Sequence, residues 1–571
     1  MIANKFNDFF TNIGPNLAKD INKPNDLNFD KYLDKKYDHN FEFKEATMED
    51  VELIINNLHS KNSFGYDHIS TKLLKQISKV LVEPITIIVN QTLRSGIFPE
   101  QLKIARVIPL YKKDDDTQFT NYRPISLLPA VSKIFEKLIF NQLYEYFQEY
   151  DLFYKGQYGF RKGHSTEFAA VELINNLIQQ MDKGDIPLCI YLDLSKAFDT
   201  LNHNILLRKL NYYGVTGTSL TLFESYLKNR KQYVELEGTN SDLLEIKTGV
   251  PQGSILGPLL FIIYVNDISN ASNLFKFILY ADDTTLTTTL NLDIDNFDEL
   301  INRELYKISD WLKVNELSLN VDKSKFMIFH HANKRFIKPK LKIDNVSVSQ
   351  VNSFNFLGLT LDENLLWNEH ITKISSKISR TIGIINKLKH LLPLNIKVTM
   401  YNSLILPYIN FGILLWGFKC SNIEKLQKKA IRCITCSRYN AHTEPLFKDL
   451  KLLKISDIFT LAKLKFYYKY VNANLPVRLL SFSFIPLNVI YNHSARNSNK
   501  LFINRVKSVF GKQSLTYDIP TVINETDANI IEKIYTHSFH GYSLYIKNRF
   551  LSKYQYVCNR LNCYICQNSN V

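Results

Sequence analysis

The chain of 571 residues lacks long hydrophobic runs. No apolar stretch reaches the about 18 residues of a membrane-spanning helix. The nearest one, Ser403 to Phe418, is interrupted by Pro407 and Asn410. The first residues do not have the pattern of a secretory signal peptide. We therefore expect no membrane partner and an intracellular location, in the nucleus, the cytoplasm or both.

Cysteine is also scarce, with seven residues. An odd number without a signal peptide is typical of a reducing compartment and does not suggest a disulfide framework. Cys433 with Cys436, and Cys563 with Cys566, have the spacing of metal ligands, and Cys558 lies near the second pair. A structural zinc ion needs four ligands, and the C-terminal end offers three cysteines. Free thiols are the simpler interpretation, with zinc as the alternative.

Acidic residues are sparse in the last quarter of the chain. Residues 421–571 contain 22 Lys and Arg against 8 Asp and Glu, whereas the first 420 residues contain 48 against 47. Scattered acids of this number do not form the four-carboxylate pattern of an RNase H. A basic C-terminal region on a nearly neutral body predicts a polyanionic partner, with nucleic acid as the first candidate.

Two adjacent carboxylates, Asp282 and Asp283, interrupt the apolar stretch from Phe275 to Thr289. Alternating apolar residues on both sides predict a strand, a turn with the acids, and a second strand. Neighbouring carboxylates repel, and their burial is costly unless a cation lies between them. Mg²⁺ is the natural cation, since it prefers oxygen ligands and leaves positions for phosphate oxygens. A solvated turn, where Asp is common, is the alternative.

A third carboxylate, Asp193, ends the predicted strand that begins at Ile186. Phe198 follows five residues later, and a bulky ring beside a nucleotide sugar would exclude ribose and favour deoxyribose.

Two further segments suit a nucleotide. A strand at Ala105 to Tyr111, a basic turn and a second strand would bring Lys112 or Lys113 and Arg123 to one end of a hairpin. Cations there suit a triphosphate, although simple surface charge explains them as well. Gln252 lies in a loop rich in Gly and Pro, where glycines permit close approach of the backbone to a ligand. Further on, Glu369 to Leu392 has the spacing of a helix with one apolar and one basic face.

These segments occur in an order that resembles the reverse transcriptases of non-LTR retrotransposons, of the LINE type and jockey-like. The resemblance covers about residues 60–420. The motifs that carry it are Val107-Ile108-Pro109-Leu110, Asn121-Tyr122-Arg123-Pro124-Ile125-Ser126, Gln157-Tyr158-Gly159-Phe160-Arg161, Asp193-Leu194-Ser195-Lys196-Ala197-Phe198-Asp199, Gly249-Val250-Pro251-Gln252-Gly253, Tyr280-Ala281-Asp282-Asp283 and Phe356-Leu357-Gly358.

The resemblance implies an α+β right-hand polymerase with fingers, palm and thumb, followed by a helical basic C-terminal extension. It divides the chain into an N-terminal linker or helical region (1–59), fingers and palm (60–362, core 93–362), thumb (363–420) and basic C-terminal region (421–571). The implied activity is RNA-directed DNA synthesis, in which dNTPs are added to a primer 3′-OH on an RNA template at a DNA target.

It also implies roles for individual residues. Asp193, Asp282 and Asp283, with the carbonyl of Leu194, would hold two Mg²⁺ ions, which Mn²⁺ could replace. Lys112, Arg123, Phe198 and Gln252 would bind the nucleotide, and Lys323 is a candidate general acid for the pyrophosphate. Phe356, Leu357 and Gly358 would form the primer grip.

Such elements usually carry an N-terminal endonuclease, but only about 60 residues precede the polymerase-like region here. We therefore expect the polymerase half of an element. Two alternatives stay open: an RNA-dependent RNA polymerase or intron maturase, against which Phe198 argues, and an inactive or domesticated nucleic-acid-binding protein. The sequence does not identify the RNA template, the DNA target or the oligomeric state.

Overall fold

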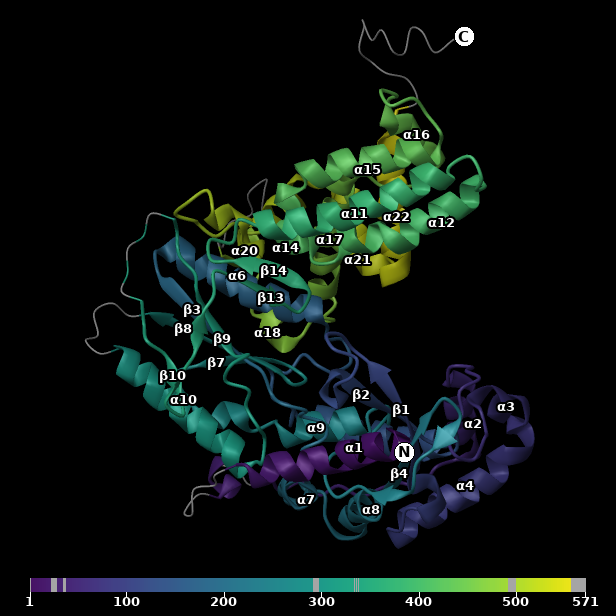
Figure 1. The fold of residues 1–571 in the computed structure, drawn as a ribbon. Coiled ribbons are helices and arrows are strands. Elements are labelled where there is room, and N and C mark those ends of the chain that lie inside the picture. The colour runs from purple at the N-terminus through teal and green to yellow at the C-terminus, as the bar shows by residue number, and fades with distance from the viewer. Residues whose placement is uncertain are drawn as a thin grey trace, which may run out of the picture.

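The structure is a computed structural model that describes residues 2–21, 28–33, 37–290, 297–332, 334, 336, 338–490 and 500–555. Cys558, Cys563 and Cys566 lie outside these residues. The fold mixes sheets and many helices, and Figure 1 shows its three parts: a sheet at the left, an N-terminal part below it and C-terminal helices above it.

The sheet at the left has five strands in the order β12-β9-β3-β8-β7. β3 lies at its centre and pairs antiparallel with both β8 and β9. The bounds are β3 Ile186–Leu192, β7 Lys276–Tyr280, β8 Asp283–Leu290, β9 Lys325–Ile328 and β12 Ser349–Gln350. The β7–β8 pair confirms the predicted hairpin, with Asp282 in its turn and Asp283 as the first residue of β8.

Both faces of β3 are buried, which explains its uninterrupted apolar sequence. Leu188 and Ile190 belong to one core, while Cys189 and Tyr191 belong to a second core on the opposite face. The first core includes α5 (Ser132–Glu149), α9 (Gly257–Tyr264) and α10 (Phe297–Val314). The second includes α6 (Thr166–Lys183), which packs on β3 and β7, and the C-terminal helices. The central sheet therefore joins the two halves of the molecule.

A second sheet lies in the N-terminal part, with the order β2-β1-β4-β5 and β6 also paired to β4. β1 runs antiparallel to β2, which confirms the predicted basic hairpin, and parallel to β4. The bounds are β1 Ile104–Tyr111, β2 Tyr122–Leu127, β4 Lys231–Leu236, β5 Thr239–Asn240 and β6 Leu244–Glu245. The helices of this part are α2 Met48–Asn57, α3 Thr71–Gln76, α4 Ser78–Ser95, α7 His203–Tyr212 and α8 Gly217–Leu227.

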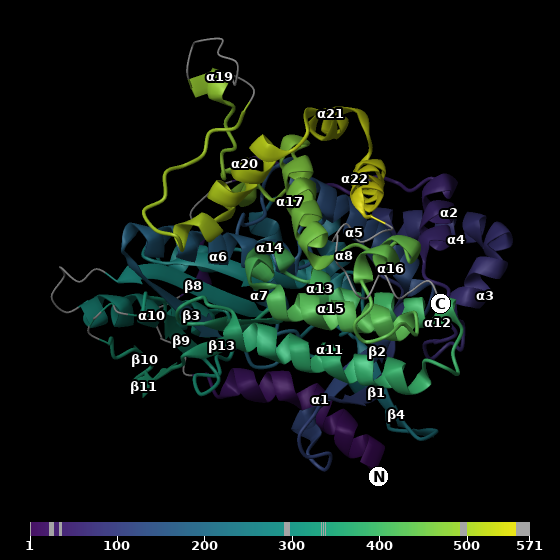
Figure 2. The ribbon, with the colours of Figure 1, turned by 90° about the horizontal axis from the view of Figure 1, so that it is seen from above.

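The N-terminal segment, expected to be a linker or helical region, forms the 18-residue helix α1 (Ile2–Lys19). Phe6 and Phe10 are buried and share a small core with Val107 of β1 and Val234 of β4. Phe6 also packs edge-on against the ring of Phe119, with ring centroids 4.7 Å apart. Aromatic burial thus fixes this segment against the second sheet (Figure 2).

Two small hairpins and a group of helices follow the central sheet. The hairpins are β10 Lys342–Ile343 with β11 Val346–Ser347, and β13 Ser353–Phe356 with β14 Leu359–Asp362. The helices are α11 Asn368–Leu388, α12 Leu394–Leu404, α13 Leu406–Asn410, α14 Ile413–Trp416, α15 Ser421–Ile434, α16 Thr443–Asp449, α17 Ile455–Val471, α18 Val477–Leu480, α19 Leu487–Ile490, α20 Leu515–Glu525, α21 Ala528–Thr536 and α22 Phe539–Lys553.

Helix α11 has the two predicted faces, although it ends at Leu388 rather than Leu392. Ile371, Ile374 and Ile378 are buried, whereas Lys373 and Lys377 are exposed. α11 packs against α15 across residue 420, and both contribute to the second core. Among the described residues no single helix has the length and apolar composition to cross a membrane; the bent pair Leu394–Asn410 and Ile413–Lys419 meets these criteria only when taken together.

Candidate active site

A cavity of about 800 Å³ opens where the C-terminal end of β3, the β7–β8 turn and the end of the β1–β2 hairpin meet. It brings together most of the residues that the sequence singled out. The predicted residues that line it are Lys112, Arg123, Asp193, Leu194, Phe198, Gln252, Asp282 and Lys323.

Strand pairing explains why acids far apart in the sequence meet here. Leu192 of β3 lies opposite Thr284 of β8, so the next residue, Asp193, continues beside the acidic turn. The backbone of Asp193 is fixed from the other side. Its N–H donates to Ser324 Oγ at 3.2 Å, and its carbonyl accepts from the N–H of Asn320 at 2.8 Å. Asp193 is therefore held by the sheet and by the turn that leads into β9.

The acidic turn is held by the loop before α6, which approaches it closely. Ala281 adopts a left-handed backbone conformation, with φ of 56°. Its N–H donates to Gln157 Oε1 at 3.1 Å, and the N–H of Gly159 donates to the same oxygen at 2.7 Å. A Cβ at Gly159 would lie 2.3 Å from the nitrogen of Ala281. Glycine is therefore required at this position to keep the turn in place.

The three carboxylates influence one another. Burial raises the pKa of Asp283 to about 6, with further contributions from Asp282 and Asp193. Burial also raises the pKa of Asp282, as does Asp193, while Arg123 and Lys112 act in the opposite direction. Asp283, the first residue of β8, has one side exposed to solvent and does not line the cavity. Asp193 and Asp282 are thus the acids that line the cavity, and Asp283 lies next to it.

The described residues contain no group of three His, Cys, Asp or Glu side chains that encloses a metal position. Repulsion between carboxylates opposes such a closed arrangement in the absence of a cation. Mg²⁺ usually binds one or two carboxylates together with substrate phosphates and water. The oxygen donors of Asp193 and Asp282 at an open cavity fit this kind of site, in which a nucleotide supplies the remaining ligands.

Cations also line the cavity. Lys112 and Arg123 are exposed at the end of the β1–β2 hairpin, which is closed by a hydrogen bond from the N–H of Lys112 to the carbonyl of Asn121 at 2.9 Å. Across the described part of the chain, neither side chain lies within ion-pair distance of a carboxylate. Both cations are therefore available to a bound anion.

Sequence reasoning gave no separate role to Lys196, although the motif Asp193 to Asp199 contains it. Its Nζ donates to the carbonyls of Tyr122 at 3.3 Å and Thr120 at 3.4 Å, which ties the acidic motif to the hairpin. Burial lowers the pKa of Lys196; Asp199 opposes that shift, and Lys112 adds to it. Lys196 lines the cavity and adds a third cation to its basic wall.

Phe198 and Gln252 are each held by a neighbour. The ring of Phe198 stacks on Phe261 of α9, with centroids 4.5 Å apart, and leaves one edge at the cavity. Gln252 Nε2 donates to both carboxylate oxygens of Asp199 at 2.9 Å. Burial raises the pKa of Asp199 to about 6. Asp199 is a second residue that sequence reasoning quoted in a motif without assigning it a part.

Lys323 lies at the cavity edge, in the turn before β9, where its N–H donates to Asn320 Oδ1 at 3.0 Å. The predicted primer grip does not line the cavity. Leu357 and Gly358 form the β13–β14 turn, with φ of 45° and 94°. Phe356 is buried, with its ring centroid 6.1 Å from that of Tyr191, two residues before Asp193. The turn is therefore adjacent to the strand that carries Asp193.

Comparison with known proteins agrees with this geometry. Residues 111–361 match the family described as reverse transcriptase (RNA-dependent DNA polymerase). This span includes the described acids, Lys112, Arg123, Phe198, Gln252, Lys323 and the Phe356 turn.

Curated proteins of similar sequence support the same family resemblance. The chain is 29% identical over 428 residues to a protein named probable RNA-directed DNA polymerase from transposon X-element of Drosophila melanogaster, which covers 72% of this chain and 46% of that protein. It is 27% identical over 444 residues to the RNA-directed DNA polymerase from mobile element jockey of the same organism, or 75% of this chain and 48% of the relative. A third similar protein, from transposon BS, is 28% identical over 436 residues, with coverages of 72% and 47%. The chain spans about half the length of these relatives, and the resemblance drawn from the motifs is confirmed.

Proposed function

We propose that this chain belongs to the reverse transcriptases of non-LTR retrotransposons and is an RNA-directed DNA polymerase that adds dNTPs to a primer 3′-OH on an RNA template; the match of residues 111–361 and the similar proteins support this. The observation that carries the proposal is the cavity in which Asp193 and Asp282 face Lys112, Arg123 and Lys196. Nucleotidyl transfer requires carboxylates that bind divalent cations and positively charged side chains that bind a triphosphate. This cavity contains both.

The parts of the fold take the roles of a right-hand polymerase in this proposal. The central sheet is the palm, since its strands carry the acids. The second sheet with its hairpin belongs to the fingers, because Lys112 and Arg123 reach the cavity from there. The helices from α11 to α14 form the thumb, with the exposed lysines of α11 toward the phosphate backbone, and residues 421–571 form the basic C-terminal region.

Two Mg²⁺ ions, replaceable by Mn²⁺, complete the site in this proposal. When bound, they lower the pKa of the primer hydroxyl and stabilise the charge on the pyrophosphate. Asp193 and Asp282, with the carbonyl of Leu194, provide oxygen ligands, and the neighbouring Asp283 adds negative charge to the site. Lys112, Arg123 and Lys196 orient the triphosphate. Lys323, at the edge of the same cavity, is positioned to give a proton to the leaving pyrophosphate.

The remaining cavity residues select and align the substrates. In this proposal, the ring of Phe198 excludes a 2′-hydroxyl from the cavity that it lines, which favours deoxyribose. Asp199 fixes the amide of Gln252 and thereby the loop that forms the floor beside the nucleotide. The β13–β14 turn with Phe356, Leu357 and Gly358 supports the primer from the side of Tyr191.

Primer extension on an RNA template with Mg²⁺ and dNTPs tests the proposal. The wild type should extend a DNA primer, and Asp193→Asn should not. Asp185→Asn is a matched control, because Asp185 is exposed at the opposite end of β3. A wild-type protein that binds RNA but never extends a primer would favour the alternative of a nucleic-acid-binding protein without catalysis.

A further inference from the structure

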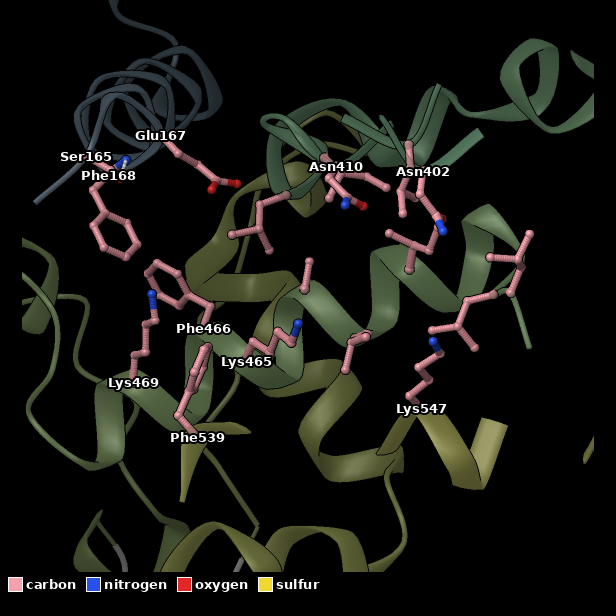
Figure 3. A pocket seen from close by; sticks show the side chains of 18 of the residues that line it. Ser165, Glu167, Phe168, Asn402, Asn410, Lys465, Phe466, Lys469, Phe539 and Lys547 are labelled. Atoms are coloured by element: carbon pink, nitrogen blue, oxygen red, sulfur yellow. Dashed lines mark hydrogen bonds between the residues drawn. The ribbon is translucent and has the colours of Figure 1, made fainter. Parts of the chain in front are cut away.

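A second cavity of about 800 Å³ lies between the start of α6 and the C-terminal helices (Figure 3). Its walls come from the loop before α6, from α12, α13 and α14, from the loop before α17, and from α17 and α22. None of the residues assigned to catalysis lines it. We call it the lysine pocket, after Lys465 and Lys469 of α17 and Lys547 of α22, which line it together with Lys451 of the loop before α17.

Lys465, Lys469 and Lys547 form no ion pair with any residue that the structure describes. Within the described ranges of the chain, none of their ammonium groups lies within ion-pair distance of a carboxylate. Burial lowers the pKa of Lys465, and the charges of Lys469 and Lys547 lower it further. Three cations that repel one another in a partly enclosed pocket destabilise the free protein, and a bound anion would relieve that repulsion.

The pocket also contains one acidic residue, which reduces the negative charge that a ligand must bring. Glu167, in the first turn of α6, faces Lys469, and burial raises its pKa while Lys469 lowers it. A single carboxylate facing one lysine leaves Lys465 and Lys547 uncompensated. The start of α6 also contributes positive dipole potential to the same wall, since the helix has 18 residues.

Aromatic and amide groups lie beside the lysines. The Nζ of Lys469 is 4.9 Å from the ring centroid of Phe168 and 5.1 Å from that of Phe539. Phe539 is 39% exposed, and its ring centroid lies 5.5 Å from that of Tyr468. Asn402 and Asn410 lie across the pocket from the lysines (Figure 3). Cations, a partly exposed ring and amides together match the way proteins hold single-stranded nucleic acid.

The loop before α6 connects the two cavities. Phe160 lines the catalytic cavity, whereas Gly163, His164 and Ser165 line the lysine pocket. A strand that leaves the catalytic cavity across this loop would reach the lysine pocket within a few residues of loop length. Continuity of this kind favours a polynucleotide strand over a small free anion.

We propose that the lysine pocket binds a single-stranded segment of nucleic acid, with Lys465, Lys469 and Lys547 on the phosphates and Phe539 stacked on a base. The proposal goes beyond the polymerase activity, because binding here requires neither dNTPs nor metal. RNA and DNA share the chemistry recognised by these groups, and separate probes distinguish them.

Binding of the full chain to labelled single strands of about 12 nucleotides tests this site. Fluorescence anisotropy in EDTA, with one RNA and one DNA probe, keeps the result independent of catalysis. Lys465→Gln/Lys469→Gln should weaken binding about tenfold and make the slope of log K against log salt shallower by about 1.4, or about 0.7 for each phosphate that is no longer neutralised. The probe whose binding weakens more identifies the natural strand.

Lys512→Gln/Lys553→Gln is the matched control, since it removes two exposed positive charges from the same region outside the pocket. It should leave binding within about twofold of the wild type. Equally weakened binding in the two double variants would overturn the proposal, because it would indicate general charge rather than a site. Full competition by poly-glutamate at equal charge, or by tripolyphosphate alone, would also overturn it.

Folding is a further check, because the pocket lysines repel one another. The double variant should melt at the same temperature as the wild type or higher. Two single variants provide the same test if the double variant misfolds: Lys547→Gln should weaken binding from the α22 side, and Phe539→Ala should weaken it without changing the salt slope. Unchanged binding in both would contradict the assignment.

Discussion

The catalytic cavity and the lysine pocket have the same volume, about 800 Å³, but opposite charge arrangements. The catalytic cavity is lined by the acids Asp193 and Asp282 together with Lys112, Arg123 and Lys196. The lysine pocket is lined by four lysines, and Glu167 is the one acid among its lining residues. The first arrangement suits a ligand that brings both cations and phosphates, and the second suits a ligand that brings phosphates alone.

The two cavities also differ in what builds them. Paired strands place the catalytic acids, and the hydrogen bonds that the N–H groups of Asp193 and Ala281 donate to Ser324 Oγ and Gln157 Oε1 fix the backbone around them. Helices α17 and α22 place the pocket lysines, which have no fixed anionic partner among the described residues. We infer that the catalytic cavity is preorganised for one chemical geometry, whereas the lysine pocket tolerates any strand with a phosphate backbone.

We expect the largest effect on activity when an acid is removed from the catalytic cavity. Asp282→Asn keeps the shape of the side chain but removes a metal-binding charge. Primer extension should fall by about a thousandfold or more, the scale of losing a central charge-stabilising group. Binding of single-stranded RNA should stay the same or tighten slightly, because a repulsive charge is gone. A variant that still extends primers at a tenth of the wild-type rate would contradict the metal-site assignment.

A second change acts on the loop that joins the two cavities. Gly159→Ala places a Cβ 2.3 Å from the nitrogen of Ala281, so the acidic turn must shift. Extension should fall about a hundredfold, since misplacement of catalytic groups by about 1 Å has an effect of this size. Gly383→Ala is the control, because a Cβ there meets no atom within 4 Å. It lies within α11 and should stabilise that helix by up to about 1 kcal/mol.

A third change alters the shape of the catalytic cavity and leaves its charge untouched. Phe198→Ala should reduce discrimination against ribonucleotides by about ten- to a hundredfold in the ratio of kcat/KM values. Tyr439→Ala, at a side chain that is 90% exposed and does not line the cavity, serves as the control and should leave the ratio unchanged. An unchanged ratio in Phe198→Ala would contradict the assignment of Phe198 as a steric gate. It would also make an RNA polymerase a possible alternative again.

The smallest expected effect concerns pH and Asp199. Its pKa is about 6 in the folded protein and about 3.9 in an unfolded chain, so the folded state binds more protons between these values. Stability should therefore fall as pH rises through about 4 to 6 and stay level above, by at most about 3 kcal/mol. Asp199→Asn should flatten this part of the profile in urea unfolding at pH 4.5 and 7.5. A slope as steep as that of the wild type would mean that another group titrates.

Much of the catalytic cavity could be predicted from the sequence. Alternating apolar residues marked the strands around Asp282 and before Asp193, and the basic hairpin followed from the turn between two short strands. These features are local, or carried by motifs of fixed order, so the sequence alone indicated them. The roles of Lys196 and Asp199 were missed, because their partners Tyr122 and Gln252 lie more than 50 residues away and only the fold brings them together.

The binding site in the C-terminal quarter of the chain was less predictable from the sequence. A net positive charge in residues 421–571 indicated a polyanion partner but not where it binds. Lys465, Lys469 and Lys547 come from two helices, and the facing wall comes from α6 and α12 to α14, far earlier in the chain. The docking of α1 on the second sheet was likewise not predicted, since its buried Phe6 and Phe10 find their partners in β1 and β4.

The most direct test of the catalytic claim measures extension and binding in the same two variants. Asp282→Asn and Lys465→Gln/Lys469→Gln are each assayed for primer extension at saturating RNA–DNA hybrid and for binding of single-stranded RNA in EDTA. We expect the first variant to lose extension and keep binding, and the second to bind about tenfold more weakly and keep extension within about twofold. Extension by Asp282→Asn at the wild-type rate would contradict the claim that the acids at the end of the central sheet carry the chemistry.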